Sequence, residues 1–367
     1  MTRKMLLVVV AAFLAPALGA SEKKPLPKDL PPFGEDKPLP VPAIAQSKLP
    51  NGLTVWIVKR GGYPRVAVKL AVRGGSAADP ENAPGISDLL ADTLKEGTTT
   101  RSARQIAEEL QAVGAEIGAS ASADAIYVTA TGLGSGAPRI LDIVADIARN
   151  PIFPAAEVEL AKGNALEALK AQEATPEYQA RKALARAVYG NHPYHVVGAT
   201  RETLQGATVE ELKKEHARRF RPENSLLVVV GDVDAAAVSA AVSRFFAPWK
   251  GTGEAPAPTP ASPAASPRRI VVVNRPGSVQ SQILIGRPVA TVTDPQYYPL
   301  LVANTICAGS FGSRLVENIR EDKGYTYSRR PGAPEGRAPD RAGRRAQRGH
   351  GGVAPRDVLR AGPDGGH

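Results

Sequence analysis

The same order of sequence patterns, two strand patterns followed by a helix pattern, occurs twice in this chain, on either side of a low-complexity segment. The first copy spans residues 52–96, and the second begins at residue 268, directly after "GTGEAPAPTPASPAASP". A segment rich in Pro, Ala and Ser stays extended and separates domains, so residues 251–267 form a predicted linker. The repeat therefore predicts two similar domains rather than one large core.

The first predicted domain covers residues 48–250 and mixes strands with helices. Apolar runs or alternation of strand length occur in "GLTVWIVKR", "RVAVKLAVRGG", "DAIYVTATG" and "SLLVVVGDVD". Helical spacing of apolar residues occurs in "PGISDLLADTLKEGT", "SARQIAEELQAVG", "APRILDIVADIARN", "PAAEVELAKGNALEALKAQEAT" and "AAAVSAAVSRFFAPW". Because 43% of the 367 residues are apolar, each of two domains can bury a core, and we predict the α+β class.

The second predicted domain starts with residues 268–328 and is truncated. In it, "RRIVVVNRPGSVQSQILIGRP" predicts two strands, and "YYPLLVANTICAGSFGSRLVENIREDKGYTYS" predicts a helix, a glycine-containing loop and a second helix. The composition changes abruptly after Ser328, since 29 of the 39 residues at 329–367 are Arg, Gly, Ala or Pro. We therefore predict a disordered tail, and out-of-frame translation of a GC-rich gene is favoured over a native tail.

The net charge of +10 does not indicate a nucleic-acid partner. Half of the excess lies in the tail, where nine Arg and no Lys stand against four acids. That tail has no aromatic side chain on which a base could stack. We therefore expect no nucleic-acid binding, although an RNA-binding arm stays open as the minor alternative.

The amino-terminal residues predict export. Residues 1–20 carry Arg3 and Lys4, then an apolar run, then small residues, which is the layout of a secretory signal peptide. The apolar run is shorter than the roughly 20 residues that span a membrane, so a membrane anchor is the weaker alternative. A Pro-rich lead at residues 21–47 should lie extended along a surface. We expect a periplasmic or secreted protein without a membrane span once the signal is removed.

Several ordered stretches resemble the insulinase or pitrilysin family of zinc metallopeptidases, in its smaller bacterial two-domain form. They span about residues 48 to 328 and comprise "LPNGLTVWIVKR", "RGGSAADPENAPGISDLLADTLKEGT", "GNHPYHVVGATRETLQGATVEELKKEHARRFRPENSLLVVVGDVD", the linker and "FGSRLVENIREDKGYTYS". The resemblance implies two similar α+β domains packed as a clamshell around an enclosed peptide cleft. It also implies that the protein functions as a dimer.

The sequence departs from this family at the zinc site. Active members carry His-x-x-Glu-His on the first helix, where two imidazoles hold Zn²⁺ and the Glu deprotonates the bound water. Aligned on Gly85 and "EGT", the two ligand positions hold Asp88 and Asp92, and the position of the base holds Ala91. The third ligand, a Glu in the family, falls at Ala168; a shift of one residue would reach Glu167. We therefore predict no metal in this chain.

One metal alternative stays open at this helix. Asp88 and Asp92 are four residues apart and could offer oxygens to a hard cation such as Ca²⁺ or Mn²⁺. Such sites need more oxygen ligands than two, so solvated or cavity-facing acids are the favoured interpretation. We predict no cofactor for this chain and expect zinc in a partner subunit.

The resemblance carries over a different pair of functional residues. In active two-domain members an Arg, and a Tyr seven residues later, reach across the cleft and stabilise the charge on the scissile carbonyl oxygen. In "IREDKGYTY" these are Arg320 and Tyr327, with Tyr325 as a second candidate. The alternative is that both side chains only pack.

These observations together predict an exported, zinc-less homologue of the insulinase-type peptidases. Its expected role is the non-catalytic subunit of a heterodimeric metalloendopeptidase, inactive alone, that supplies Arg320 and Tyr327 to a peptide substrate. The expected partner is a homologous subunit that bears the zinc. A scaffold or peptide-binding subunit without a role in catalysis is the alternative.

Overall fold

The computed structural model describes most of the two predicted domains. The described residues are 34, 41–257, 259–260, 267–289, 291 and 293–326. The predicted signal peptide, most of the predicted lead, Tyr327, Ser328 and the predicted tail lie outside them. The chain divides into two compact units, Met1–Val41 and Pro42–His367, and all described secondary structure belongs to the second.

A six-stranded sheet forms the centre of the first predicted domain. Its strands are β1 (Ala45–Lys48), β2 (Thr54–Lys59), β3 (Arg65–Arg73), β4 (Glu116–Ala121), β5 (Ala125–Leu133) and β6 (Ser225–Gly231). Their order across the sheet is β1-β2-β6-β3-β5-β4. Only β2 and β6 run parallel; all other neighbours are antiparallel. Because β2 and β6 are adjacent in the sheet, residues far apart in sequence build its middle.

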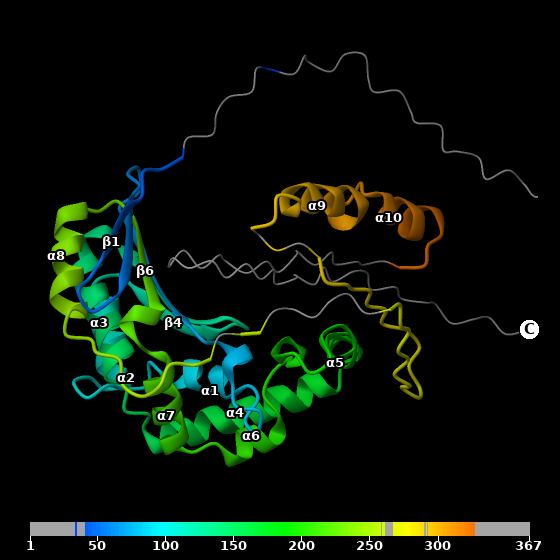
Figure 1. Ribbon diagram of the computed structural model, residues 1–367, viewed down its shortest axis with the longest axis horizontal. Helices are drawn as coiled ribbons and strands as arrows, with labels where there is room; N and C mark the ends of the chain where they lie inside the picture. The colour runs from blue at the N-terminus through cyan, green and yellow to red at the C-terminus, as the bar shows by residue number, and fades with distance from the viewer. Residues whose placement is uncertain are drawn as a thin grey trace, which may run out of the picture. The chain divides into compact units, whose positions relative to one another are not determined.

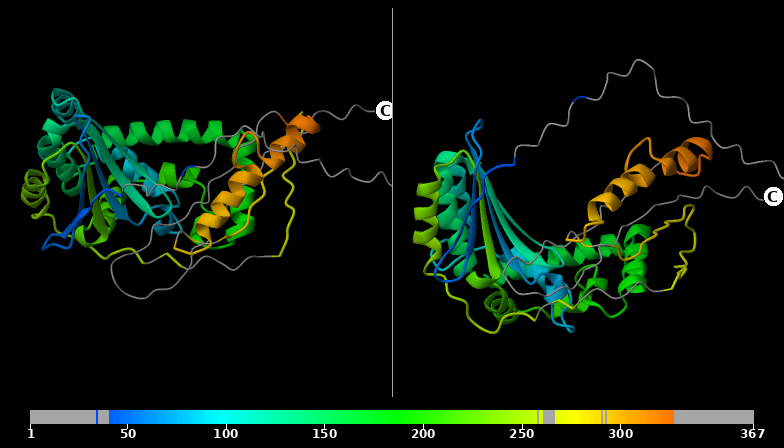
Figure 2. Two further views of the ribbon diagram at one scale, coloured as in Figure 1. Left: turned by 90° about the horizontal axis from the view of Figure 1, so that it is seen from above. Right: turned by 45° about the horizontal axis from the view of Figure 1, so that its top comes forward.

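Helices cover one face of this sheet and, in the view of Figure 1, extend below the strands. They are α1 (Ile86–Thr93), α2 (Ala103–Ala112), α3 (Ala137–Arg149), α4 (Ala155–Glu173), α5 (Pro176–Tyr189), α6 (Arg201–Gly206), α7 (Val209–Arg219) and α8 (Ala235–Phe246). Figures 1 and 2 show α3 and α8 on one side of the strands, and α3 contacts β3 and β5 while α8 contacts β2. None of the described helices is both long and apolar enough to cross a membrane.

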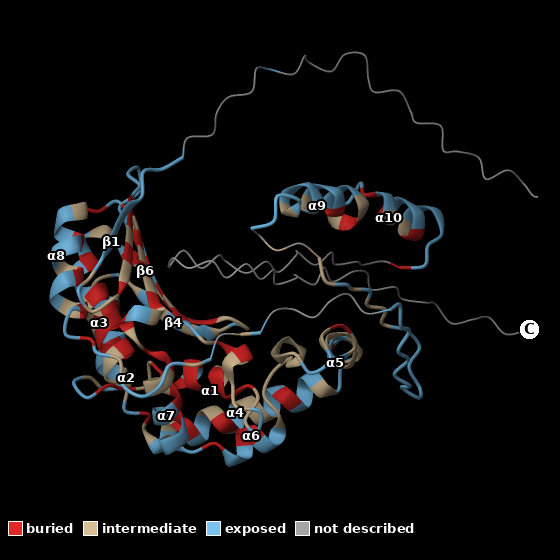
Figure 3. Cartoon of the chain, viewed as in Figure 1, coloured by how far each residue is buried: buried red, intermediate tan, exposed pale blue. Residues whose placement is uncertain are grey.

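The core lies between the strands and these helices. On β3 the alternate side chains Val66, Val68, Leu70 and Val72 are at most 1% exposed, whereas the residues between them, two alanines and Lys69, are exposed or half-buried. This alternation is the pattern that predicted the strand, and it buries one face only. Figure 3 shows the buried residues gathered where α3 meets the sheet and along α1. The α+β class is confirmed.

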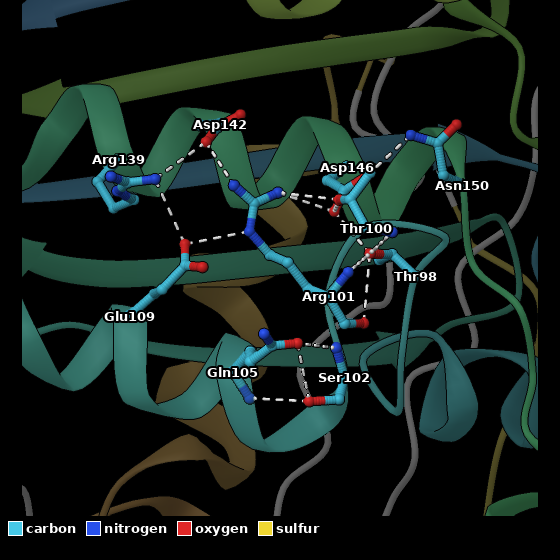
Figure 4. Close-up of polar contacts among 10 residues, drawn as sticks. All are labelled: Thr98, Thr100, Arg101, Ser102, Gln105, Glu109, Arg139, Asp142, Asp146 and Asn150. Carbon is cyan, nitrogen blue, oxygen red and sulfur yellow. Dashed lines mark hydrogen bonds and ion pairs between the residues drawn. The ribbon is translucent and has the colours of Figure 1, made fainter.

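A network of charged side chains holds the start of α2 against α3 (Figure 4). The Arg101 guanidinium contacts carboxylates of Glu109 at 3.1 Å, Asp142 at 2.6 Å and Asp146 at 2.8 Å. Burial alone would raise the pKa of Asp146, but hydrogen bonds, that of Asn150 first, lower it below its usual value. Asp146 therefore stays ionised and fixes the loop before α2 by charge-assisted hydrogen bonds.

Some elements were not anticipated from the sequence. The strands β1 and β4 and the helix α5 carry no clear apolar period; on β4 the sequence is "EIGASA", with half-buried small side chains. By contrast, α2 begins within its predicted segment at a capping box, in which the Ser102 side chain accepts the Gln105 N–H and the Gln105 side chain accepts the Ser102 N–H.

The two strands predicted within residues 268–287 are wrong. The described residues 267–289 form no strand, and apolar side chains such as Ile270 and Val272 are more than 80% exposed. A strand requires a neighbour for its backbone hydrogen bonds, and no described strand pairs with this segment. The helical prediction holds: α9 (Tyr297–Asn304) continues as Thr305–Gly309, and α10 (Arg314–Val316) continues as Glu317–Asp322.

The His216 ring on α7 is neutral in the folded protein. It stacks on Phe220 with centroids 4.5 Å apart and meets the edge of Phe153 at 5.9 Å. Burial lowers the pKa of His216 from 6.5 to about 4, against the opposing hydrogen bond of Nε2 with the Ala148 carbonyl oxygen. The unfolded chain therefore binds a proton at His216 at a higher pH than the folded chain does.

We expect acid to destabilise the fold through this residue. Stability is fully present above pH 6.5 and falls as the pH drops from 6.5 towards about 4. Part of the ring remains accessible to solvent, so the expected loss is about 1 to 3 kcal/mol. Urea unfolding followed by tryptophan fluorescence at neutral and acid pH measures it. The variant His216→Gln should lose that much less stability on acidification, whereas the control His195→Gln should behave as wild type. Equal losses in all three would contradict the assignment to His216.

Candidate functional site

The helix α1 occupies the place in the fold where the sequence predicted a degenerate metal site. Its apolar residues Ile86, Leu89 and Leu90 are at most 2% exposed and join the main core. The preceding Gly85 has a left-handed backbone with φ of 82°. A Cβ atom there would lie 2.2 Å from the Cα of Ala199, so only glycine allows this close approach.

A buried ion pair fixes the first turn of α1. The Asp79 carboxylate accepts the backbone N–H of Gly85 at 2.7 Å and the hydroxyl of Ser87 at 3.2 Å. Its other oxygen lies 2.8 Å from Nη2 of Arg219, the last residue of α7. The Arg219 side chain is 0% exposed and also lies 2.8 Å from Glu215. Burial raises the pKa of Asp79 and the Arg219 charge opposes that rise.

Sequence reasoning missed this pair. The Arg219 residue lies in a segment rich in Lys and Arg, which is typical of a solvated helix. The only local signal was Asp79 followed by Pro80 shortly before a helix, and such a position often accepts N–H groups of the first turn. Its partner could not be named, because it lies 140 residues away.

The two aspartates of α1 face away from the core. Asp88 is half-buried and Asp92 is exposed, one helical turn apart. Burial, and then the negative charges of Asp79 and Asp92, raise the pKa of Asp88 to about 6. Partial burial also raises the pKa of Asp92, with Lys95 opposing the rise. Near pH 6 the Asp88 carboxyl is therefore divided between its protonated and its ionised form.

The remaining positions of the predicted site offer no ligand. Ala91 is 1% exposed and packs into the core. Ala168 lies on α4, which contacts α1, but both Ala168 and Glu167 are exposed, and the Glu167 carboxylate lies 3.9 Å from Lys170. The structure therefore gives no support to the alternative alignment in which Glu167, rather than Ala168, takes the position of the third ligand.

These residues do not fit the zinc ion of the active enzymes. Zinc in such sites takes imidazole nitrogens and a Glu carboxylate in tetrahedral geometry, whereas α1 and α4 present two carboxylates and two alanines. Within the described part of the chain, no group of three or more His, Cys, Asp or Glu side chains could hold a metal ion.

The second predicted pair of site residues is described only in part. Arg320 lies in the helical continuation of α10 with its Nε 3.3 Å from Glu321 and its guanidinium carbon 4.7 Å from the centroid of the Phe311 ring. Tyr325 is 59% exposed. Tyr327 lies outside the described residues, so its distance from Arg320 stays a prediction.

Curated relatives of the chain are described as zinc proteases. An uncharacterized zinc protease of Bacillus subtilis is 27% identical over 280 residues, which cover 76% of this chain and 67% of that protein. One of Mycobacterium leprae is 28% identical over 292 residues, covering 78% and 64%. The chain thus spans about two thirds of the length of these relatives.

Solved structures share the fold. The crystal structure of a peptidase M16 inactive domain from Pseudomonas fluorescens has a TM-score of 0.77 at 25% identity, covering 87% of this chain and 74% of that one. A protease from Helicobacter pylori has a TM-score of 0.78 at 18% identity, covering 88% and 76%. The second likeness is one of fold alone.

Two family models match consecutive parts of the sequence. The model described as insulinase, peptidase family M16, matches residues 55–197, and the model of the peptidase M16 inactive domain matches residues 206–332. Both models describe one family, and together they span the sheet from β2 onward, the helix α1 and the segment that holds Arg320. The chain therefore belongs to the insulinase family of peptidases, family M16.

Proposed function

We propose that this chain is an exported, non-catalytic subunit of a heterodimeric M16 peptidase. The observation that carries the proposal is the state of α1. The helix has buried apolar residues along one side, Gly85 directly before it, and the Asp79–Arg219 ion pair at its first turn. At the positions where active members carry two zinc ligands and a base, it carries Asp88, Asp92 and Ala91. The scaffold of the site is retained without its metal chemistry.

Carboxylates at these positions are poor substitutes for imidazoles. Asp88 and Asp92 offer only carboxylate oxygens where the zinc sites of active members take imidazole nitrogens, and the third ligand position holds Ala168. Ala91 cannot take a proton from water, so hydrolysis would lack its general base even if a cation bound. In this proposal the zinc and the base belong to a homologous partner subunit.

The chain itself would contribute to substrate binding. Arg320 is a permanent cation, and by resemblance to the family it and Tyr327 would donate hydrogen bonds to the carbonyl oxygen of a peptide in the partner's site. Such donors act where negative charge grows in the transition state, and they need no metal of their own. The predicted signal peptide supports a periplasmic or secreted place for this complex.

A second candidate is a scaffold or peptide-binding subunit without a catalytic role. The contacts of Arg320 favour it, because the guanidinium packs over Phe311 and approaches Glu321 within the same helical segment. An arginine held by such neighbours can serve packing alone. The two candidates differ in what the loss of Arg320 does to turnover.

We expect the purified chain to carry well below one zinc ion and to cleave no peptide alone. Elemental analysis after purification without chelator tests the metal, and a quenched-peptide assay tests the activity. The double variant Asp88→His with Asp92→His places two imidazoles one turn apart and should raise Zn²⁺ affinity over wild type, measured by calorimetry. Stoichiometric zinc in the wild-type chain, removable only by strong chelators, would contradict the zinc-less assignment.

We expect Arg320 and Tyr327 to matter only in the complex. The chain, co-expressed with an exported homologue that has an intact His-x-x-Glu-His, should show peptidase activity absent from either protein alone. Loss of one preorganised oxyanion donor lowers turnover by about 10²-fold to 10³-fold, so Arg320→Ala or Tyr327→Phe should have that effect.

Assembly distinguishes the two candidates in that experiment. The matched control is Arg314→Ala, an exposed arginine six residues before Arg320, which should leave turnover unchanged. Size-exclusion chromatography should show intact complexes for all variants. Full activity of Arg320→Ala, or a loss of activity that follows from dissociation, would favour the scaffold instead.

A further inference from the structure

The sheet presents an open face that no described helix of its own domain covers. We define the open face as the side chains of β1 to β6 that point away from α3 and α8. One row across it is set by the strand register, in which Trp56, Val228, Lys69, Thr129 and Gly118 are successive partners. Directly paired residues point to the same side of a sheet. None of the five is buried, which is unlike the core side of the same strands.

A line of cations runs along the middle of this face. Arg65, Lys69 and Arg73 are exposed and occur at every fourth position of β3, which places them about 13 Å apart along the strand. Across the six strands, the only acid among the open-face positions is Glu116 on the edge strand β4, and the Thr131 hydroxyl donates to it at 3.0 Å. Within the strands, cations therefore outnumber acids on the open face. One residue beyond β6, the exposed Asp232 lies opposite Arg65, and its backbone N–H donates to the Arg65 carbonyl oxygen at 3.0 Å.

Two of these cations form no ion pair with a described carboxylate. Neither Arg65 nor Lys69 forms an ion pair with any described residue, and the Lys69 Nζ lies instead 4.1 Å above the centroid of the Tyr127 ring. The cross-strand partners of Lys69, Val228 and Thr129, are uncharged. An anion from outside the domain could thus approach Lys69 without displacing a carboxylate.

The strands beside β3 give the same face an apolar half. Trp56 on β2 and Leu226, Val228 and Val230 on β6 are half-buried, and they form a strip next to the cations because β6 is the neighbour of β3. A ligand that matches both halves carries acidic groups at intervals along one edge and apolar groups along the other. An extended polypeptide has this layout, since its side chains alternate in direction.

We propose that the open face binds an extended acidic peptide, with carboxylates over Arg65 and Lys69 and apolar side chains over the strip that contains Trp56. This inference rests on the proposed function, because it names the class of peptide that the subunit would receive. A nucleic acid is the less suitable occupant. Nucleic-acid binding typically engages about six to ten phosphates, whereas this face has few cations and half of it is apolar.

Fluorescence anisotropy with the full chain tests the proposal. The probe is a labelled peptide of about 13 residues with Glu at every fourth position, Leu on either side of each Glu and Ser at the remaining positions, and the control peptide has Gln in place of each Glu. We expect tighter binding of the Glu peptide at low salt and a loss of that preference at high salt. For Lys69→Gln, binding of the Glu peptide should weaken about threefold, and for Arg65→Gln with Lys69→Gln about tenfold.

The matched control is Lys213→Gln, which removes the same charge from an exposed position on α7. It should leave the binding of both peptides unchanged, and the affinity for the Gln peptide should be the same in all variants. Equal affinity for both peptides, no binding of either, or an equal effect of Lys213→Gln would overturn the proposal. So would a single-stranded oligonucleotide that displaces the peptide at lower concentration. No zinc-bearing partner takes part, so failure here leaves the split-peptidase proposal standing, and the reverse also holds.

Discussion

The buried ion pair between Asp79 and Arg219 determines where α1 begins and therefore where the site lies. Arg219 is fully buried, and its Nε and Nη1 atoms have no hydrogen-bond partner within the described part of the chain. Removing one member of a buried pair typically costs about 3 to 5 kcal/mol, because the other charge stays in a medium that solvates it poorly. The pair also joins the segment before α1 to the end of α7, so the placement of α1 does not depend on the residues at its ligand positions.

That independence means that the residues at the predicted ligand positions can change while the helix keeps its shape. The core side of α1 is set by Ile86, Leu89 and Leu90, while Asp88 and Asp92 lie on the other side and contribute little packing. Ala91 shows the limit of this freedom. By resemblance to the family this is the predicted position of the general base. It is buried against the core here, and a charged side chain there would need solvation that the core does not offer.

The sequence predicted what local periodicity controls and missed what distant contacts control. The strands β3, β5 and β6 and the helices α2 and α3 follow from apolar spacing and capping, and they were found where expected. Strand β4 was missed because its small side chains show no contrast between faces, and the strands predicted at 268–287 failed because pairing depends on a neighbour that local pattern does not reveal. Of the candidate site, the residue types at positions 88, 91 and 92 could be read from the sequence, whereas the pairing of Arg219 with Asp79 required the fold.

Metal chemistry and peptide binding place different demands on the same domain. A zinc site fails when one ligand is lost, since three protein groups must meet at one point within a few tenths of an ångström. The open face of the sheet depends instead on alternation along six strands, and its charge comes from several cations on β3. Substitutions at Asp88 and Asp92 on α1 leave the open face intact, because both side chains lie outside the core that α1 shares with β3. The same fold can therefore support a subunit that binds peptides without hydrolysing them. Such a subunit would contribute to proteolysis through a partner that keeps its zinc.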